Sequence, residues 1–370
     1  MIRAERLINL FTELVTIDNP SLHEEKISAR IQEIFRQLNI TYTEDNAGTK
    51  IGGSCGNLHA YIDGDLPLPP LLFSAHMDSV DPAVHKKAII QEGGKITSDG
   101  STVLGADDLS GICTILEAIT SIKEDGVSHR PIELLFDVAE ETYCAGIQQF
   151  QFSEMKSKEA YVFDLTGSIG SAAYQAPAIL SFRAEFTGKA AHAAFSPEDG
   201  IHAIKTACDA VSAIPCGRIG DTTVNIGTIT GGSADNIVPS GCSFTGEVRG
   251  FDNVTVQKQI SKIRDTVEEV ARKSNTTVSF STKPLCLAYR VDPEALVAKR
   301  FIKACEDMEL PSDLKITYGG SDNNHFFQNG IKGLVVACGM NNCHGCQEYT
   351  YTEDLVRAAS LAEALMRSKL

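Results

Sequence analysis

The sequence of 370 residues predicts an α/β fold with two domains, a larger one with a mostly parallel sheet and a smaller one inserted into it. Short apolar runs typical of buried strands alternate with helical periodicity near both ends of the chain, as in parallel sheets. Between residues 179 and 284 the predicted order becomes strand, helix, strand, strand, helix, strand. Histidine and acidic residues lie where predicted strands end, which is the edge at which open α/β sheets bind ligands.

The first part of the chain supplies predicted elements of the larger domain. Residues 3–17 place apolar side chains on one helical face and predict an opening amphipathic helix. A buried strand is predicted over residues 71–75, a helix over 109–122, and two further strands over 132–138 and 161–163. Each strand leads directly or within a few residues into a histidine or an acidic side chain, so we expect those side chains to meet at one edge of the sheet.

The inserted domain is predicted over residues 179–284, which leaves residues 1–178 and 285–370 to the larger domain. Its strands are predicted at 179–186, 222–229, 242–251 and 276–281, and its helices at 200–214 and 254–274. This order predicts a ferredoxin-like βαββαβ sandwich. Alternation then resumes, with a helix over 293–308, a strand over 332–338 and a C-terminal helix from Glu353.

Composition and charge argue against several classes of partner. The formal net charge is −15 and no lysine or arginine cluster overrides it, so we expect binding neither to nucleic acid nor to an anionic membrane. No apolar run approaches the roughly 20 residues that span a bilayer, and residues 1–14 lack a signal-peptide core. The 11 cysteines are odd in number and scattered, which fits reduced thiols in a cytoplasmic protein.

Seven polar residues near these strand ends and helix starts are the candidate functional residues: His76, Asp78, Asp107, Glu140, Glu141, Asp164 and His344. Two imidazoles and three carboxylates, one of them shared, are the inventory of a site for two metal ions. A further carboxylate beside such ligands is free to move a proton. The set therefore favours a hydrolase.

Each of these residues also has an ordinary structural interpretation. Asp107 precedes a helix, where aspartate is a favoured N-cap. Glu140 and Glu141 could be an acidic pair in a first helical turn. His76 could belong to a simple strand-to-loop turn, and Asp164 could merely end a strand. The placement of all of them near strand ends favours one shared site over five separate structural roles.

Taken in order, these motifs resemble those of the M20 metallopeptidases, and within that family the peptidase T-like (tripeptide aminopeptidase-like) branch. The matching segments are His76–Asp78, Leu104–Asp108, Glu140–Glu141, Asp164, His344–Glu348, Gly188–His192, Pro197–Gly200 and Gly231–Pro239. The resemblance runs from about the first helix to the last. It implies a zinc-exopeptidase-like catalytic domain and an inserted lid domain that mediates dimerisation.

The resemblance also implies a set of metal ligands. His76, Asp107 and Asp164 would hold one zinc ion, and Asp107, Glu141 and His344 would hold the other. Cobalt and manganese ions also suit such ligands. The implied cofactor is therefore a pair of divalent metal ions, with Asp107 as the bridge between them.

Further roles follow from the same resemblance. Glu140 would be the general acid and base, and Asp78 would orient the neighbouring histidine ligand. His192, Asn236 and Arg249 match lid positions that resemble substrate-binding groups. The implied protein is a homodimer that hydrolyses short peptides, with a tripeptide aminopeptidase as the expected activity. An M20-type carboxypeptidase, an N-acyl amino acid deacylase and a non-catalytic metal-binding interaction protein are the alternatives.

The chain departs from the family pattern at several places. Leu109 replaces a frequent lysine, the usual glycine after the glutamate pair is displaced by the segment 142–144, and the segment 323–325 is unfamiliar. These departures bear on substrate preference. Cys343 and Cys346 flank the predicted histidine ligand and could form a thiolate metal site, although the role implied for that histidine accounts for the other motifs as well.

Overall fold

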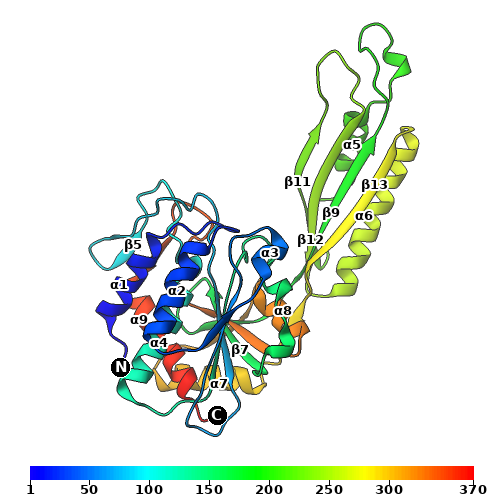
Figure 1. The fold of residues 1–370 in the computed structure, drawn as a ribbon. Helices are drawn as coiled ribbons and strands as arrows, with labels where there is room; N and C mark the ends of the chain where they lie inside the picture. The colour runs from blue at the N-terminus through cyan, green and yellow to red at the C-terminus, as the bar shows by residue number, and fades with distance from the viewer. The chain divides into compact units, whose positions relative to one another are not determined.

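The computed structural model describes all residues from Met1 to Leu370 and divides into two compact units (Figure 1). Unit 1 consists of Met1–Gln175, Arg290–Thr317 and Ser321–Leu370, and unit 2 consists of Ala176–Tyr289 with Tyr318–Gly320. The chain therefore leaves unit 1 near residue 175, builds unit 2, and returns. The fold class is as predicted, an α/β catalytic unit with an inserted smaller unit.

Unit 1 is built on a sheet with the strand order β1-β2-β6-β3-β7-β16-β8-β14, and β15 pairs with β8. The strands are β1 (Tyr42–Glu44), β2 (Leu58–Ile62), β3 (Leu71–His76), β6 (Ile132–Asp137), β7 (Glu159–Leu165), β8 (Ser171–Ala176), β14 (Tyr289–Arg290), β15 (Asp313–Ile316) and β16 (Lys332–Ala337). The four strands β6, β3, β7 and β16 run parallel. Every residue of β3 and β6 is buried, as their apolar composition requires of a parallel sheet covered on both faces.

Helices cover this sheet and supply most of the core. They are α1 (Ala4–Val15), α2 (Glu25–Gln37), α3 (Ala47–Ile51), α4 (Ala106–Asp125), α7 (Leu296–Asp307), α8 (Asp322–Gln328) and α9 (Thr352–Arg367), with 3-10 turns at Ile147–Gln149 and Phe152–Glu154. Helix α4 packs against β3, β7, α1 and α9, and its residues from Ala106 to Ile119 are all buried. An apolar helix of this kind fixes the residues at its N-terminus firmly against the sheet.

A small sheet of unit 1 holds the loop before the C-terminal helix. It consists of β4 (Ile89–Ile90), β5 (Lys95–Thr97) and β17 (Tyr349–Tyr351), in the order β17-β5-β4. Asn341 and Tyr349 exchange two backbone hydrogen bonds of 3.0 Å, which close the intervening loop at its base. This loop carries His344.

Unit 2 has one five-stranded antiparallel sheet in the order β10-β11-β12-β9-β13. Its elements are β9 (Ala178–Thr187), a 3-10 turn (Pro197–Asp199), α5 (Ala203–Ala213), β10 (Gly217–Ile219), β11 (Thr222–Gly231), β12 (Gly241–Gly250), α6 (Asn253–Lys273) and β13 (Thr277–Cys286). The long strands and two helices follow the βαββαβ order predicted from the sequence. Alternate residues of β9, including Phe182 and Phe186, are buried under α5 and α6, because one face of this sheet packs on helices.

No helix of the structure is both long and apolar enough to cross a membrane.

Candidate metal centre

The structure brings the five predicted metal ligands together at the carboxyl edge of the parallel strands of unit 1. His76 is the last residue of β3, and Asp164 lies within the end of the neighbouring β7. Glu141 follows β6, Asp107 lies at the start of α4, and His344 lies in the loop between β16 and β17. Asp164 therefore belongs to its strand, whereas the sequence predicted that it follows the strand. His76 lies at a strand end and Asp107 at a helix start, whereas Glu141 and His344 lie in the loops that follow β6 and β16.

Asp107 lies between the two histidines and faces each with a different oxygen. Its Oδ1 is 3.0 Å from Nε2 of His76, and its Oδ2 is 3.2 Å from Nε2 of His344. On the first side Asp164 Oδ1 is 3.9 Å from Nε2 of His76, and on the second side Glu141 Oε2 is 3.1 Å from Nε2 of His344. One carboxylate thus separates two groups, each with an imidazole and a second carboxylate.

The charges of this centre shift the pKa values of its members. Burial alone would lower the pKa of His76, but its hydrogen bonds to Asp107 and Asp78 outweigh burial and raise that pKa well above its usual value. Hydrogen bonds to Asp107 and Glu141 raise the pKa of His344 to about 10. The carboxylates around both imidazoles therefore favour positive charge at this place.

Asp78 holds the segment that follows β6. Its backbone oxygen is 3.0 Å from Nδ1 of His76, and its Oδ1 is 3.3 Å from the same nitrogen. The same carboxylate accepts hydrogen bonds from the backbone N–H groups of Glu140 and Glu141, and from the hydroxyl of Ser21 at 2.6 Å. Asp78 therefore contacts the ring of one histidine and also binds the backbone of the two glutamates.

Glu348 is a member of the centre to which the sequence assigned no role. This buried carboxylate accepts hydrogen bonds from the backbone N–H groups of Gly105, at 2.7 Å, and Asp107, at 2.8 Å. Gly105 has a φ of +77°, which a side chain would strain. Glu348 lies four residues after His344, at the end of a matched motif, and that position was the available signal. It fixes the backbone that presents the bridging carboxylate.

Glu140 lies beside the centre, and the residue as a whole is half-buried. The thiol of Cys144 donates a hydrogen bond to its Oε1 at 3.2 Å. Burial raises the pKa of Glu140 well above its usual value, and the negative charges of Asp322 and Glu141 add to this shift. A carboxyl group with a raised pKa is suited to taking up and returning a proton near neutral pH.

Glu24 and Asn57 bind the backbone of the segment that follows β6. Glu24 Oε1 accepts hydrogen bonds from the backbone N–H groups of Ala139, at 3.0 Å, and Leu22, at 2.8 Å. Asn57 Oδ1 accepts one from the backbone N–H of Val138 at 3.1 Å. Ala139 has a φ of +55°, an uncommon conformation that these bonds stabilise. No periodicity marks such residues in a sequence, since they act on backbone groups far along the chain.

Glu24 should make the stability of the protein depend on pH. Burial raises its pKa from 4.5 to about 7, so the folded chain binds this proton more tightly than the unfolded chain does. Stability is therefore lost as pH rises from the unfolded pKa to the folded one, by up to about 3 kcal/mol for this group. We expect Glu24→Gln to remove this loss, so that the variant gains on the wild type between pH 4.5 and 8.

Urea unfolding of the metal-free protein at several pH values measures this difference. The exposed neighbour Glu25 provides the matched control, Glu25→Gln, which should show no such gain. A constant difference between Glu24→Gln and the wild type over this range would contradict the prediction.

The donor set fits two divalent cations. It offers two imidazole nitrogens and three carboxylates, the ligand types that zinc and related ions take. Glu141 Oε1 is buried without a hydrogen-bond partner, so one ligand oxygen lacks a positively charged partner. A bound cation would take the place of the hydrogen bonds that the two imidazoles make to the carboxylates. The donor atoms of His76, Asp107 and Glu141 lie within 4.8 Å of one another, and so do those of His76, Asp108 and Asp164.

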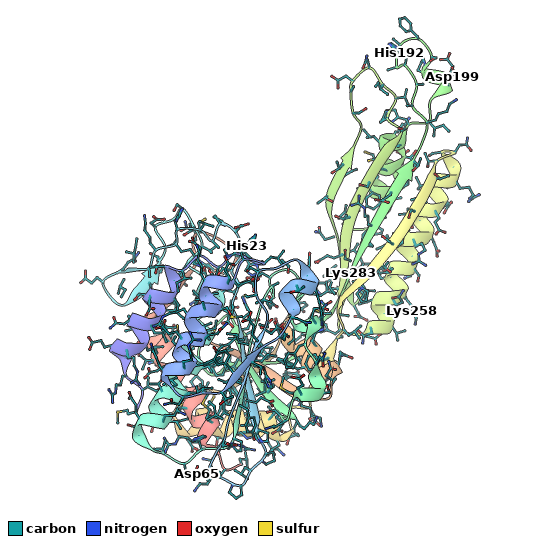
Figure 2. The ribbon with its side chains drawn as sticks, viewed as in Figure 1. His23, Asp65, His192, Asp199, Lys258 and Lys283 are labelled. Carbon is teal, nitrogen blue, oxygen red and sulfur yellow. The ribbon has the colours of Figure 1, made fainter.

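The three predicted substrate-binding residues lie in unit 2, and the structure does not bring them together. His192 follows β9 and stacks on Phe195 with 4.3 Å between ring centroids, and the backbone oxygen of Asn236 accepts a hydrogen bond from Ala193. These residues are exposed near one end of the sheet, where Figure 2 labels His192. Arg249 lies at the other end of β12, with its Nε 2.7 Å from Glu247.

The register of the sheet gives the separation. Gly241 pairs with Thr187 at one end of β9 and β12, and Arg249 pairs with Ile179 at the other. Eight residues of strand span about 25 Å. His192 and Arg249 of one chain therefore cannot contact the same small substrate.

Unit 1 is an α/β unit with a donor set for two cations at the carboxyl edge of its sheet, and Glu140 lies beside that set. These features define a class of protein, the metal-dependent hydrolases. Two family models match the chain: "Peptidase dimerisation domain" over residues 175–275, and "Peptidase family M28" over residues 57–212. The first lies almost wholly in unit 2, and most of the second lies in unit 1.

Relatives over the whole length define the family. The chain is 32% identical to the uncharacterized protein YqjE of Bacillus subtilis, and the match covers 99% of both chains. A tripeptidase from Staphylococcus aureus superimposes with a TM-score of 0.94 and 29% identity, covering 99% of this chain and 98% of that one. Aminopeptidase PepT from Bacillus cereus gives a TM-score of 0.88 and 30% identity with the same coverage. The chain belongs to the M20 family of metallopeptidases, in the branch that contains peptidase T.

Proposed function

We propose that this protein is a tripeptide aminopeptidase that works with two divalent metal ions, zinc being the expected pair. The observation that carries the proposal is Asp107, whose two oxygens face two different imidazoles while Glu140 stands beside them without a ligand role. The similarity to a tripeptidase and to an aminopeptidase PepT supports short peptides as substrates.

The residues of the centre would have different roles in metal binding and proton transfer. His76, Asp107 and Asp164 would hold one ion, and Asp107, Glu141 and His344 the other. When bound, the ions would supply Lewis-acid polarisation of the scissile carbonyl and would acidify water at the site. Glu140 would take a proton from the attacking water and deliver it to the nitrogen of the leaving amine. Its raised pKa fits both steps.

Unit 2 offers a pocket suited to the carboxylate end of a peptide. A pocket of about 390 Å³ is lined by two arginines and two aspartates, Arg218, Arg249, Asp221 and Asp252, and by Tyr318 among others. Arg249 is held by Glu247 and donates from Nη1 to the backbone oxygen of Tyr318 at 3.2 Å. The guanidinium carbon of Arg218 lies 5.3 Å from the centroid of the Tyr318 ring. A guanidinium pairs well with a carboxylate, so we propose that this pocket binds the carboxylate of the substrate.

We propose that the active form is a homodimer in which each site receives His192 from the partner subunit. The match of residues 175–275 to a peptidase dimerisation domain supports association through unit 2. The separation of His192 from Arg249 along the sheet supports delivery from a second copy. His192 would then donate a hydrogen bond to the oxyanion that forms on the scissile carbonyl.

His192→Ala should keep two metal ions and normal folding but lose about 10²–10³-fold in kcat, because it removes one oxyanion donor. The stronger test mixes this variant with Glu140→Gln under conditions of subunit exchange. In a mixed dimer one site regains both groups, so random mixing should restore about a quarter of wild-type activity. Absence of rescue after proven exchange would count against delivery across subunits, and an unchanged kcat in His192→Ala would remove this histidine from the reaction.

Peptides with blocked ends test the proposed activity. We expect the protein loaded with zinc, cobalt or manganese to release the N-terminal residue of a free tripeptide, and to leave an N-acetylated tripeptide intact. Cleavage of the acetylated peptide together with rejection of a C-terminal amide would support the carboxypeptidase or deacylase alternative instead. Absence of hydrolysis of any amide with all three metals would favour the non-catalytic alternative.

A further inference from the structure

A second cluster of metal-type side chains lies in unit 1 and includes Glu140. It consists of Glu140, Cys144, Asp322 and His325. The donor atoms of Glu140, Cys144 and Asp322 lie within 4.8 Å of one another, and a ring nitrogen of His325 lies within 4.8 Å of the sulfur of Cys144. None of Cys144, Asp322 and His325 has a role in the proposed reaction.

The local structure points these side chains at one another. Asp322 and His325 are three residues apart on α8, which places them on one face of this helix. Cys144 has a φ of +54°, and its thiol lies 3.2 Å from Glu140 Oε1.

The cluster contains buried acceptors that lack a positive partner. Asp322 is 2% exposed, and its Oδ1 receives no hydrogen bond. Next to it lies Asp137, which is fully buried, and the carboxyl groups of Asp137 and Asp322 share a hydrogen bond. The buried Nε2 of His325 also lacks a partner. Burial of carboxyl groups in this state requires a proton or a cation nearby.

We propose that Glu140, Cys144, Asp322 and His325 form a third cation site that takes a soft divalent ion such as cadmium, or zinc in excess. One sulfur, one imidazole nitrogen and two carboxylates match the ligand preferences of these ions. Donor atoms at ordinary zinc distances in a tetrahedron lie about 3.3–3.8 Å apart, close to the 3.2 Å between Cys144 and Glu140. Binding would displace the thiol proton of Cys144 to solvent as the sulfur–metal bond forms.

Occupation of this site would inhibit the enzyme. A cation that shares Glu140 occupies the oxygen that must receive the proton of the attacking water, so the reaction would stop at proton transfer. This consequence rests on the proposed function, whereas the binding of the ion does not.

Cadmium binding is measured directly on the full chain already loaded with two metal ions. We expect one further cadmium ion per chain, with the ultraviolet charge-transfer band of a cadmium–thiolate bond and release of a proton. Cys144→Ser should abolish the band and weaken binding about tenfold or more, because a hydroxyl is a poor ligand for a soft ion. Asp322→Asn and His325→Gln should keep the band but weaken binding, which provides two further variants if Cys144→Ser misfolds.

Two other cysteines provide the controls. Cys305 is buried in α7, away from both metal clusters, and Cys305→Ser should leave the band and the affinity unchanged. Cys343 lies next to His344 and bonds to Asp107, so it is the competing thiolate. A band that persists in Cys144→Ser, or that disappears in Cys343→Ser, would overturn the proposal.

Inhibition provides the second readout. Peptide hydrolysis by each variant is compared with its own uninhibited rate as free zinc increases beyond two ions per chain. We expect the inhibition constant to rise about tenfold or more in Cys144→Ser and to be unchanged in Cys305→Ser. If the protein hydrolyses no peptide, the proposed function fails but the cadmium titration still decides the site. If the peptidase is active and no third ion binds, the site alone is wrong.

Discussion

Glu140→Gln should lower kcat by about 10²–10⁴-fold, the usual contribution of a general acid or base, while both metal ions remain bound. The amide keeps the size of the side chain and removes only its capacity to take up a proton. The five predicted ligands lie on other residues, so their geometry is not disturbed. The expected signature is a fall in kcat with little change in KM.

Single-turnover kinetics and elemental analysis on the same preparation measure the two halves of this result. The matched control is Glu154→Gln, an exposed glutamate in the 3-10 turn Phe152–Glu154, which should retain the wild-type rate. A rate close to wild type in Glu140→Gln would place the base elsewhere. Loss of metal in that variant would mean that Glu140 is itself a ligand.

Asp107→Ala should remove more metal than any other single change at the centre. Its two oxygens face His76 at 3.0 Å and His344 at 3.2 Å, so both ion positions share this carboxylate. The loss of affinity should exceed the roughly 10–100-fold that follows removal of a group that merely orients a ligand. Activity should fall with the metal content, because neither ion keeps a full set of ligands.

Metal content after dialysis against a weak chelator measures this loss. Asp164→Ala and Glu141→Ala provide the comparison, since each should weaken only one of the two ions. A content that stays at two ions per chain in Asp107→Ala would show that this carboxylate is not the bridge. Equal losses of metal in all three variants would indicate that the ions bind only as a pair. Asp107 would then not be distinguished from the other ligands as a bridge.

The fold followed from local patterns to a large degree. Apolar strands such as 71–75 and 132–138 and the helical periodicity of 109–122 reappear as β3, β6 and α4. Several elements were not predicted from the sequence, among them the 13-residue helix α2 and the short elements β4, β14 and α8. Strands β4 and β14 have two residues each, and α8 has seven. Such short elements form because the surrounding structure positions them, and no periodicity develops over so few residues.

The sequence by itself determined which residue types gather at the sheet edge, because a parallel strand delivers the residue at its end to a fixed place. His76, Asp107, Glu141, Asp164 and His344 could therefore be named before their distances were known. Only the tertiary structure decided how they divide around Asp107, since that division depends on side-chain directions. It also revealed the supporting groups Glu24 and Glu348 and the cluster around Cys144. These act through contacts between residues far apart in the chain, and contacts of that kind leave no periodic trace in a sequence.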